Sequence, residues 1–594
     1  MDRNTLTALV LMALLLVTFN VFFQPEPTPP ATTAATADST KTATPQPVAA
    51  LAALDSTATA IFPQTNATEQ TLNMENDVMK VELTSKGGRI KKVELKKYKT
   101  HDGKPLILVD GSSNVQNYTF AIGAKNIETQ QFNFATQQIN ANSVSFKLQA
   151  DSTSYFEQTY TLPQGDSYVL DYVVNMVGMD KKIANGAPIK LSLANEILSQ
   201  EKAITTERQN SGIYFKPKDD SPDYLFSTSD ANKAAETPTQ WVSFKQDFFN
   251  NTLIAKTGAF NTANFALQYP TDANNHRTIA TNKADLAFNY EAKNNFSFPM
   301  QYYLGPNHYQ TLRKMNNEMQ ALLPLGWGIF GWVNKFIIIP IFNLLSKFIS
   351  NYGIIILLLT LIIKLVLWPL TYKSYLSFAK MNVLKPELEA LRQKHGNDAQ
   401  ALQVEQMKLY NQAGVSPFGG CLPQLLQFPI LVAMYRFFPA SIELRQQSFL
   451  WAKDLSTYDS IWDLPFRIPL YGDHVSLFCL LSAASTYLYS RLNNQMTPST
   501  SPEMAMQMKM MQYLMPIMLV FIFNSFSAGL TYYVLVSNLI SFAQQWAIKK
   551  YFIDEQKIHA EIASNKAKPA KKSAFQQRME EAMEEQRRRQ QQKK

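Results

Sequence analysis

The chain divides into two unlike parts by the spacing of its apolar residues. From about Thr71 to Tyr309, apolar and polar residues alternate in short runs that are separated by polar turns. This alternation is typical of β-strands with one buried face. After residue 325 the apolar residues form long runs instead, which is typical of membrane-spanning helices. We therefore predict a membrane protein in which a large all-β sandwich precedes an α-helical bundle.

The hairpin signal in the first part is clearest over Val78–Val93, which predicts a strand, a Gly-Gly turn and a second strand. Many short strands with polar turns indicate one sandwich domain over residues 63–310. No His/Ser/Asp group or carboxylate pair stands out there, which favours a binding or spacer role over catalysis. Further strands are expected at Tyr118–Ile122, Val144–Leu148, Tyr155–Leu162, Tyr168–Val177, Ile189–Leu193, Trp241–Phe244, Asn264–Tyr269 and Leu286–Glu291.

The N-terminal residues 1–23 form an apolar run that follows Arg3. A run of this kind is either a cleaved signal peptide or an uncleaved membrane anchor. No small-x-small cleavage site follows directly, so we favour an anchor. Residues 24–62 are rich in Pro, Ala and Thr and predict an extended flexible linker.

The most informative stretch of the second part is Asn351–Tyr372, which is apolar except for one charge, Lys364, and is about long enough to span a bilayer. Thr360 and Trp368 lie one turn on either side of Lys364 and are expected on the same helix face. A lysine within hydrocarbon costs roughly 2.5–3.5 kcal/mol. It either snorkels to the nearer interface or marks a polar intramembrane site, and we favour the site.

Four more core spans are expected, and together with the anchor they make a six-span bundle within which residues 351–548 form the core. Two of the four are short, at about 15–16 residues, which would thin the bilayer locally. Residues 311–350 predict helices on the outer side. Gly326–Ile349 could itself span the membrane, but its lysines and tryptophans favour a helix that lies in the membrane interface. The four spans are Pro417–Phe438, Val475–Ser490, Gln512–Phe526 and Ala528–Trp546, with a Met-rich loop between the second and third of these four.

Charge fixes the expected orientation. The helical hairpin 373–416 and the tail 549–594 are basic, whereas the loop Ser441–Leu470 is slightly acidic. Basic segments stay in the cytoplasm, so both termini are expected inside and the β domain outside.

Several polar side chains could share one hydrated space within the bundle. Taken singly, each glutamine or tyrosine could equally make an ordinary interhelical hydrogen bond. Together with a lysine, they favour a positive cavity that accepts polar polypeptide. The candidate residues are Lys364, Thr360, Gln424, Gln427, Tyr532 and Tyr533, with Asn538 beside them.

Composition adds little to this picture. The net charge of +9 suits a membrane surface or a nucleic acid. The two cysteines, Cys421 and Cys479, lie in apolar segments and predict neither a disulfide framework nor a metal site. Without a nucleophile–base pair or metal cluster in the sequence, an enzyme is the least expected class, and no cofactor is expected.

The second part closely resembles the YidC membrane protein insertases over residues 326–550. The order of parts also matches the long form of Gram-negative bacteria. The motifs that carry the resemblance are Trp368-Pro369-Leu370-Thr371, Ala379-Lys380-Met381, Gly419-Gly420-Cys421-Leu422-Pro423, Gln427-Phe428-Pro429, Ile442-Glu443-Leu444-Arg445, Ser527-Ala528-Gly529-Leu530 and Val536-Ser537-Asn538.

The resemblance implies a bacterial inner-membrane insertase and chaperone with a cytoplasm-open groove, whose central positive residue attracts the client's polar segment. It implies no nucleotide, no metal and no DNA partner. The implied partners are nascent membrane proteins, the Sec translocon, the ribosome and signal-recognition targeting components, and the lipid bilayer.

One departure concerns the central residue, which is usually arginine in the family and is Lys364 here. Lysine supplies a point charge without the planar fork of arginine. Two other classes remain open: a transporter or channel for a small anion, and an envelope scaffold that works through the β domain.

Overall fold

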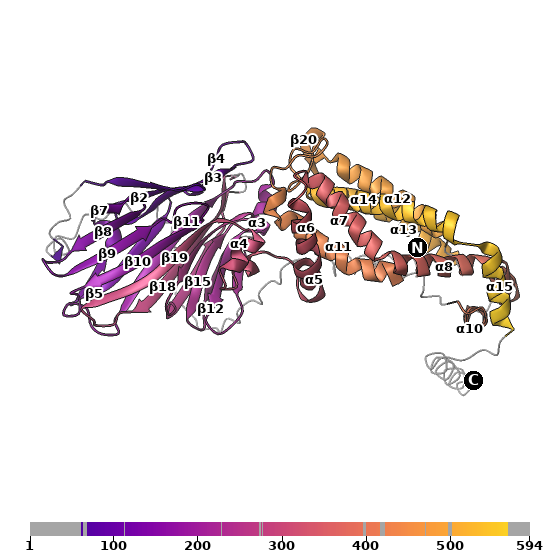
Figure 1. The fold of residues 1–594 in the computed structure, drawn as a ribbon, viewed down its shortest axis with the longest axis horizontal. Helices are drawn as coiled ribbons and strands as arrows, with labels where there is room; N and C mark the ends of the chain where they lie inside the picture. The colour runs from indigo at the N-terminus through magenta and orange to yellow at the C-terminus, as the bar shows by residue number, and fades with distance from the viewer. Residues whose placement is uncertain are drawn as a thin grey trace, which may run out of the picture.

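The computed structural model describes residues 61–567 except 63–67, 112, 227–228, 273–274, 276, 396–398, 416–421, 470 and 497–501. The molecule is elongated, with the β domain at one end and the helices at the other (Figure 1). The expected anchor and most of the expected linker lie outside the described residues, as do Cys421 and the tail beyond residue 567. Cys479 is buried and forms no disulfide.

Three antiparallel sheets build the β domain (Figure 1). In spatial order, the nine-stranded sheet consists of β13 (Asp223–Phe226), β12 (Gly212–Pro217), β15 (Thr239–Lys245), β16 (Phe249–Ala255), β19 (Asn295–Pro306), β10 (Val169–Val177), β9 (Tyr155–Thr161), β8 (Ser143–Gln149) and β7 (Ala135–Asn140). The six-stranded sheet consists of β14 (Ala231–Ala234), β17 (Thr262–Gln268), β18 (Thr278–Asn289), β11 (Pro188–Leu198), β5 (Val115–Ile122) and β6 (Lys125–Glu128). The four-stranded sheet is β1 (Thr71–Glu75), β2 (Met79–Thr84), β3 (Arg89–Lys99) and β4 (Pro105–Val109). Two short helices, η1 (Thr129–Gln131) and α3 (Ile204–Gln209), lie between strands.

The core lies between the two large sheets, because alternate residues of each strand face inward. On β10 every second residue is buried. Phe120 of β5 stacks on Phe156 of β9 with ring centroids 5.4 Å apart, and Tyr172 of β10 donates a 2.7 Å hydrogen bond to the hydroxyl of Tyr118. The predicted sandwich is therefore confirmed, as is its first hairpin, where Gly87 and Gly88 turn with φ of +76° and +62°.

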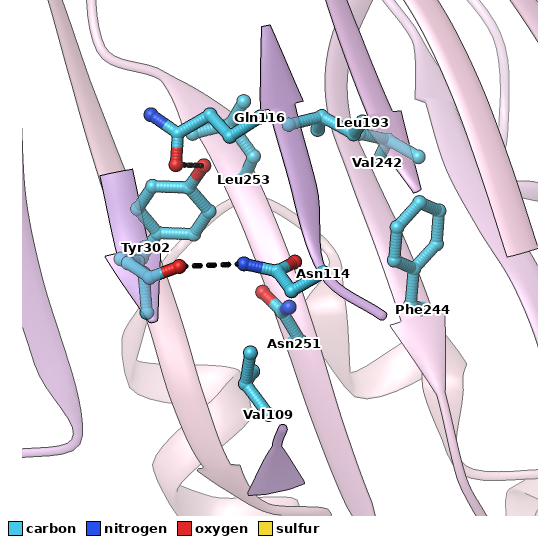
Figure 2. Close-up of a pocket in the computed structure, with 10 residues that line it drawn as sticks. Val109, Asn114, Gln116, Leu193, Val242, Phe244, Asn251, Leu253 and Tyr302 are labelled. Atoms are coloured by element: carbon cyan, nitrogen blue, oxygen red, sulfur yellow. Dashed lines mark hydrogen bonds between the residues drawn. The ribbon is translucent and has the colours of Figure 1, made fainter. Parts of the chain in front are cut away.

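A small cavity opens inside the sandwich beside Gln116 and Tyr302 (Figure 2). Tyr302 donates to the side-chain oxygen of Gln116 at 3.3 Å, and Asn114 donates to the carbonyl of Ile90 at 2.7 Å. The volume of the cavity is about 20 Å³, which is room for a single water molecule. This cavity is therefore part of the packing of the domain and is too small for an organic ligand.

The remaining elements are mostly helices. In chain order they are α4 (Tyr309–Lys314), η2 (Met319–Leu322), α5 (Gly328–Val333), η3 (Asn334–Ile338), α6 (Ile339–Ser346), α7 (Tyr352–Val366), α8 (Trp368–Val383), α9 (Lys385–His395), α10 (Ala399–Gln412), α11 (Leu422–Ala440), η4 (Ile442–Leu444), the hairpin β20 (Trp462–Ile468) and β21 (Gly472–Val475), α12 (Leu477–Met496), α13 (Pro502–Phe523), α14 (Ala528–Ala547), η5 (Ile548–Phe552) and α15 (Glu555–Lys566).

The prediction of one straight helix over Asn351–Tyr372 is wrong. Helix α7 ends at Val366, and α8 begins at Trp368 after a bend of 61°. Pro369 explains the break, because proline has no N–H to donate and its ring clashes with the carbonyl four residues earlier. Trp368 therefore does not continue the face of Lys364, and its ring lies 6.2 Å from that of Phe552.

The first helix of the predicted helical hairpin 373–416 is also divided. The sequence predicts one helix from Lys373 to His395, but α8 ends at Val383 and α9 starts at Lys385. Pro386, at the start of α9, is again compatible with a helix start and not with a helix interior.

The two spans predicted to be short belong to longer helices. Helix α12 has 20 residues and α13 has 22, and both extend into the stretch that the sequence predicts as a Met-rich loop. Apolar runs mark where a helix can face lipid, whereas good helix formers carry the helix further into water. Helix length therefore gives no support to a locally thinned bilayer.

Segment Gly328–Ser346 is a continuous helix in which α5, η3 and α6 follow one another. By length and composition it is the one helix among the described residues that could cross a membrane, and the bent pair α7–α8 makes a second if counted as one span. The interfacial placement of this segment and the count of six spans remain predictions. The preceding stretch, predicted as one helix over Thr311–Leu323, is divided into α4 and η2.

The β domain docks on the helical half through the loop that follows α11. Arg445 donates from Nη2 to the carbonyl of Lys99 at 2.6 Å. Gln446 donates to the carbonyls of Lys99 and Thr100 at 3.1 and 3.0 Å. The two halves are thus joined by polar contacts as well as by the chain itself.

Candidate functional site

The site is organised along one face of α14. Ser537 and Ser541 are one turn apart and both are buried, and the hydroxyl of Ser541 donates to the carbonyl of Ser537 at 2.8 Å. Gln544 follows on the same side and is also buried. Since α14 packs along α7, these side chains form a polar line inside an otherwise apolar helix pair. We call Tyr533, Ser537, Ser541 and Gln544 the α14 polar line.

Lys364 of α7 meets this line at Ser541. The ammonium Nζ donates to the hydroxyl of Ser541 at 2.7 Å, and the side-chain amide of Gln544 donates to the backbone carbonyl of Lys364 at 3.1 Å. The lysine is only 5% exposed. Its side chain therefore points into the bundle, and the alternative of a lysine that snorkels along the lipid face does not describe this structure.

Thr360 lies one turn before Lys364 and is 1% exposed. Its hydroxyl donates to the carbonyl of Ile356 in its own helix at 2.7 Å. The predicted shared face of Thr360 and Lys364 is present, but the hydroxyl is already satisfied within α7.

Gln427 of α11 also reaches the α14 polar line, and Tyr533 is bonded within the line. Gln427 of α11 donates from Nε2 to the hydroxyl of Ser537 at 3.4 Å. The hydroxyl of Tyr533 is hydrogen-bonded to the same serine. Three helices thus contribute to one polar line that begins at Tyr533 and ends at Lys364 and Gln544.

The other candidates lie elsewhere. Tyr532 points into an aromatic cluster, with ring centroids 4.9 Å from Phe449 and 5.3 Å from Phe478. Asn538 donates to the hydroxyls of Ser485 and Thr486 on α12 at 3.0 and 2.9 Å, which is an ordinary interhelical contact. Gln424 lies on α11, but its side chain is outside the described part of the structure.

Sequence reasoning missed Ser541 and Gln544, and it treated Ser537 only as part of a motif. A signal was available: three polar residues at positions 537, 541 and 544 recur at helical spacing within an apolar run. Serine alone is too common at helix–helix contacts to identify a site.

The electrostatics follow from what surrounds the ammonium group. Among the residues that the structure describes, no acidic side chain forms an ion pair with Lys364. A hydroxyl satisfies one of its three donors without neutralising its charge. A buried cation without a counter-ion is costly, so this position favours any anionic group that can reach it.

Comparisons with known proteins identify the family of the chain. Residues 71–343 match the family model "YidC periplasmic domain", and residues 344–556 match "60Kd inner membrane protein". The membrane protein insertase YidC of Amoebophilus asiaticus is 40% identical over 98% of both chains. That of Bacteroides fragilis is 36% identical over 98% of this chain and 97% of its own. A crystal structure of YidC from Thermotoga maritima is 13% identical with a TM-score of 0.27, covering 80% of this chain and 97% of that one. With full-length relatives above one-third identity and two family models that together cover both halves, the chain belongs to the YidC family of inner-membrane protein insertases.

Proposed function

We propose that this chain moves polar segments of newly made membrane proteins through a hydrated groove, open to the cytoplasm, in which Lys364 is the central cation. The observation that carries the proposal is the bond from the Lys364 ammonium to Ser541 inside the bundle, at a place where the described residues provide no counter-charge. A client's acidic side chain would supply that charge.

The size of such an attraction decides whether it matters. Two unit charges 4 Å apart attract by about 4 kcal/mol at an effective dielectric constant of 20. This is comparable with the cost of placing a charged residue at the centre of a spanning helix, about 2.5–3.5 kcal/mol. Lys364 can therefore offset much of the cost of one acidic residue in a translocated segment.

The α14 polar line has a separate role in the proposal. An extended polar segment carries unpaired N–H and C=O groups, each of which is costly in hydrocarbon. Hydroxyl and amide groups at successive turns offer replacement hydrogen bonds along the path. Tyr533, Ser537 and Ser541 are spaced to serve one stretch of chain in this way.

The orientation and partners of the chain belong to the same proposal. The basic hairpin and tail favour a cytoplasmic location for both termini, with the β domain outside. Membership of the family supports cooperation with the Sec translocon and delivery of clients by ribosomes and signal-recognition components. We propose that the protein works by binding and electrostatics and not by covalent catalysis.

The test uses purified protein in liposomes with a small single-span client that carries acidic residues in its translocated segment, scored by protease protection. Lys364→Ala is expected to slow insertion about tenfold, the factor for about 1.4 kcal/mol, whereas Lys364→Arg retains it. Lys335→Ala is the matched control, because Lys335 is an exposed lysine of the preceding helix. With a client whose acidic residues are replaced by their amides, wild type and Lys364→Ala should show the same insertion rate.

Full insertion of the acidic client by Lys364→Ala would overturn the electrostatic role. The same liposomes distinguish the two alternatives. Flux of a small anion without any client would indicate a transporter or channel, and an activity that depends on the β domain but not on Lys364 would indicate a scaffold.

A further inference from the structure

The C-terminal helix α15 packs on the cytoplasmic helices α8, α9 and α10 at the end of the molecule farthest from the β domain (Figure 1). Asp554 caps its first turn by accepting from the backbone N–H of Lys557. Only Ile558 and Ile562 of this helix are buried, at 3% and 5% exposure. They are four residues apart, so α15 presents one narrow apolar stripe.

This stripe completes a small hydrophobic cluster that is separate from the membrane core. The cluster members from the hairpin side are Met381, Leu384, Leu388, Leu409, Tyr410, Ala413 and Val415. Without α15, the hairpin would therefore expose an apolar surface of the kind that binds the apolar face of a helix.

Polar contacts hold α15 within the stripe and beyond its C-terminal end. Lys380 of α8 donates to Glu561 at 2.7 Å, and Lys566 donates to Oε2 of Glu387 on α9 at 2.6 Å. Asn565 donates to the carbonyl of Ala413, just after α10, at 3.3 Å. One helix thus ties together three elements of the cytoplasmic region.

Glu387 also borders a cleft of about 310 Å³ between α9 and α10. Leu391 and Leu409 supply apolar groups to this cleft, and Lys394 and Glu405 are among its charged residues. A space of this size accepts large side chains of a bound segment. The end of α15 thus lies at the border of the cleft, with Lys566 bound to Glu387.

We propose that a hydrophobic helical segment of a client docks on the hairpin face that α15 covers, and that α15 is a latch that must be released first. The proposal rests on the proposed function and adds to it a regulated step. The segment of this chain that occupies the hairpin face is α15. The client segment that competes with it is also a helix with an apolar stripe.

The contacts that hold α15 are weak enough to be broken. The four charged side chains retain between 14% and 50% of their exposure, so each pair contributes little and is weakened by salt. Two isoleucines supply the apolar contact.

The test is charge reversal in the full-length protein, read by hydrogen–deuterium exchange of peptides from α9 and α10. Glu561→Lys and Lys566→Glu each place like charges against their partners. Each is expected to speed exchange about threefold, in keeping with the strength of exposed ion pairs. Adding Lys380→Glu to the first variant, or Glu387→Lys to the second, restores the opposite charges and should restore protection. Ala560→Lys is the matched control, since Ala560 lies on the exposed side of the same helix and away from its first turn.

The competition itself is tested with a photoreactive residue at Leu391, which borders the cleft and packs on the cluster. The single-span client should crosslink more strongly to the released variants and return to the wild-type yield in the restored ones. Unchanged exchange in both reversals would overturn the latch. Faster exchange without more crosslinking would overturn the competition. Neither readout depends on insertion, so a failure of the proposed insertion activity would be seen separately in the liposome assay.

Discussion

Arg445, in the loop after α11, donates from Nε to Oε1 of Glu201 in the β domain at 2.7 Å. The two side chains are 2% and 10% exposed. They lie 244 residues apart in the chain. The guanidinium also lies over the ring of Phe249, 5.1 Å from its centroid. A buried ion pair therefore joins the two halves of the molecule, which makes their relative placement a property of particular side chains.

Arg445→Ala should loosen this junction. Removing one partner leaves Glu201 as an unpaired buried group, which costs about 3–5 kcal/mol. Hydrogen exchange of residues 199–210 and 441–447 measures the loss. Gln446→Ala is the control, because it removes only neutral hydrogen bonds worth about 1 kcal/mol each. Equal exchange in the two variants would contradict the role of the ion pair.

The junction should also depend on pH. Burial raises the pKa of Glu201 to about 7, because removing the carboxylate from water costs more than the attraction of Arg445 returns, although breaking the pair would cost more still. Burial, with the nearby charge of Glu201, raises the pKa of Glu207 to about 8. Both values exceed the ordinary pKa of 4.5. The two carboxyl groups therefore stabilise the folded state fully below pH 4.5, and this contribution is lost as pH rises toward about 8.

Exchange at the junction should therefore be slower at pH about 5 than at pH about 8, after correction for the intrinsic rate. Burial also raises the pKa of Asp247 and lowers that of Lys245. The Asp247 shift acts over the same pH range as those of the glutamates and in the same direction, whereas the Lys245 shift acts in the opposite direction at pH about 8 and above. Glu207→Gln should flatten the upper part of the profile, and an unchanged profile in that variant would rule out Glu207 as its source.

Ser541→Ala tests the contact that holds Lys364. The substitution leaves the ammonium group without its hydroxyl acceptor, at a cost of about 1–3 kcal/mol for a buried charged donor. Thermal unfolding in detergent measures the loss. Ser537→Ala should cost less, because both of its side-chain partners are uncharged: Gln427, whose bond is long at 3.4 Å, and Tyr533. The reverse order of the two effects would contradict the assignment of Ser541 as the principal partner.

Gly353→Ala should disturb the start of α7. A Cβ at this position would lie 2.1 Å from ring atoms of Phe449. Overpacking of this kind costs about 1–3 kcal/mol. Phe449→Leu makes room, so the double variant should be less destabilised than the sum of the single variants, as expected for residues in contact. Additive losses would show that the two residues do not meet.

The strands of the β domain were predictable because period-two alternation is local and one face of each strand is buried. The bend after α7 was also readable, since Pro369 cannot continue a helix in its interior, but the apolar run on both sides concealed it. The ends of α12 and α13 were not predictable, because apolar runs do not mark where a helix ends.

The candidate site was partly predictable for a similar reason. Lys364 stands out as a charge in an apolar run, whereas Ser541 resembles any small residue at a helix–helix contact. The contact between Arg445 and Glu201 could not be predicted from one sequence, since no local pattern connects positions so far apart.

The break after Val366 has an electrostatic consequence. It places Lys364 in the last turn of α7, where the aligned peptide dipoles end in a partial negative charge. In the straight helix expected from the sequence, the lysine would have been more than a turn from any such terminus. Pro369, by ending α7 here, provides the ammonium group with a field from the backbone itself, independent of any side chain and of any passing client.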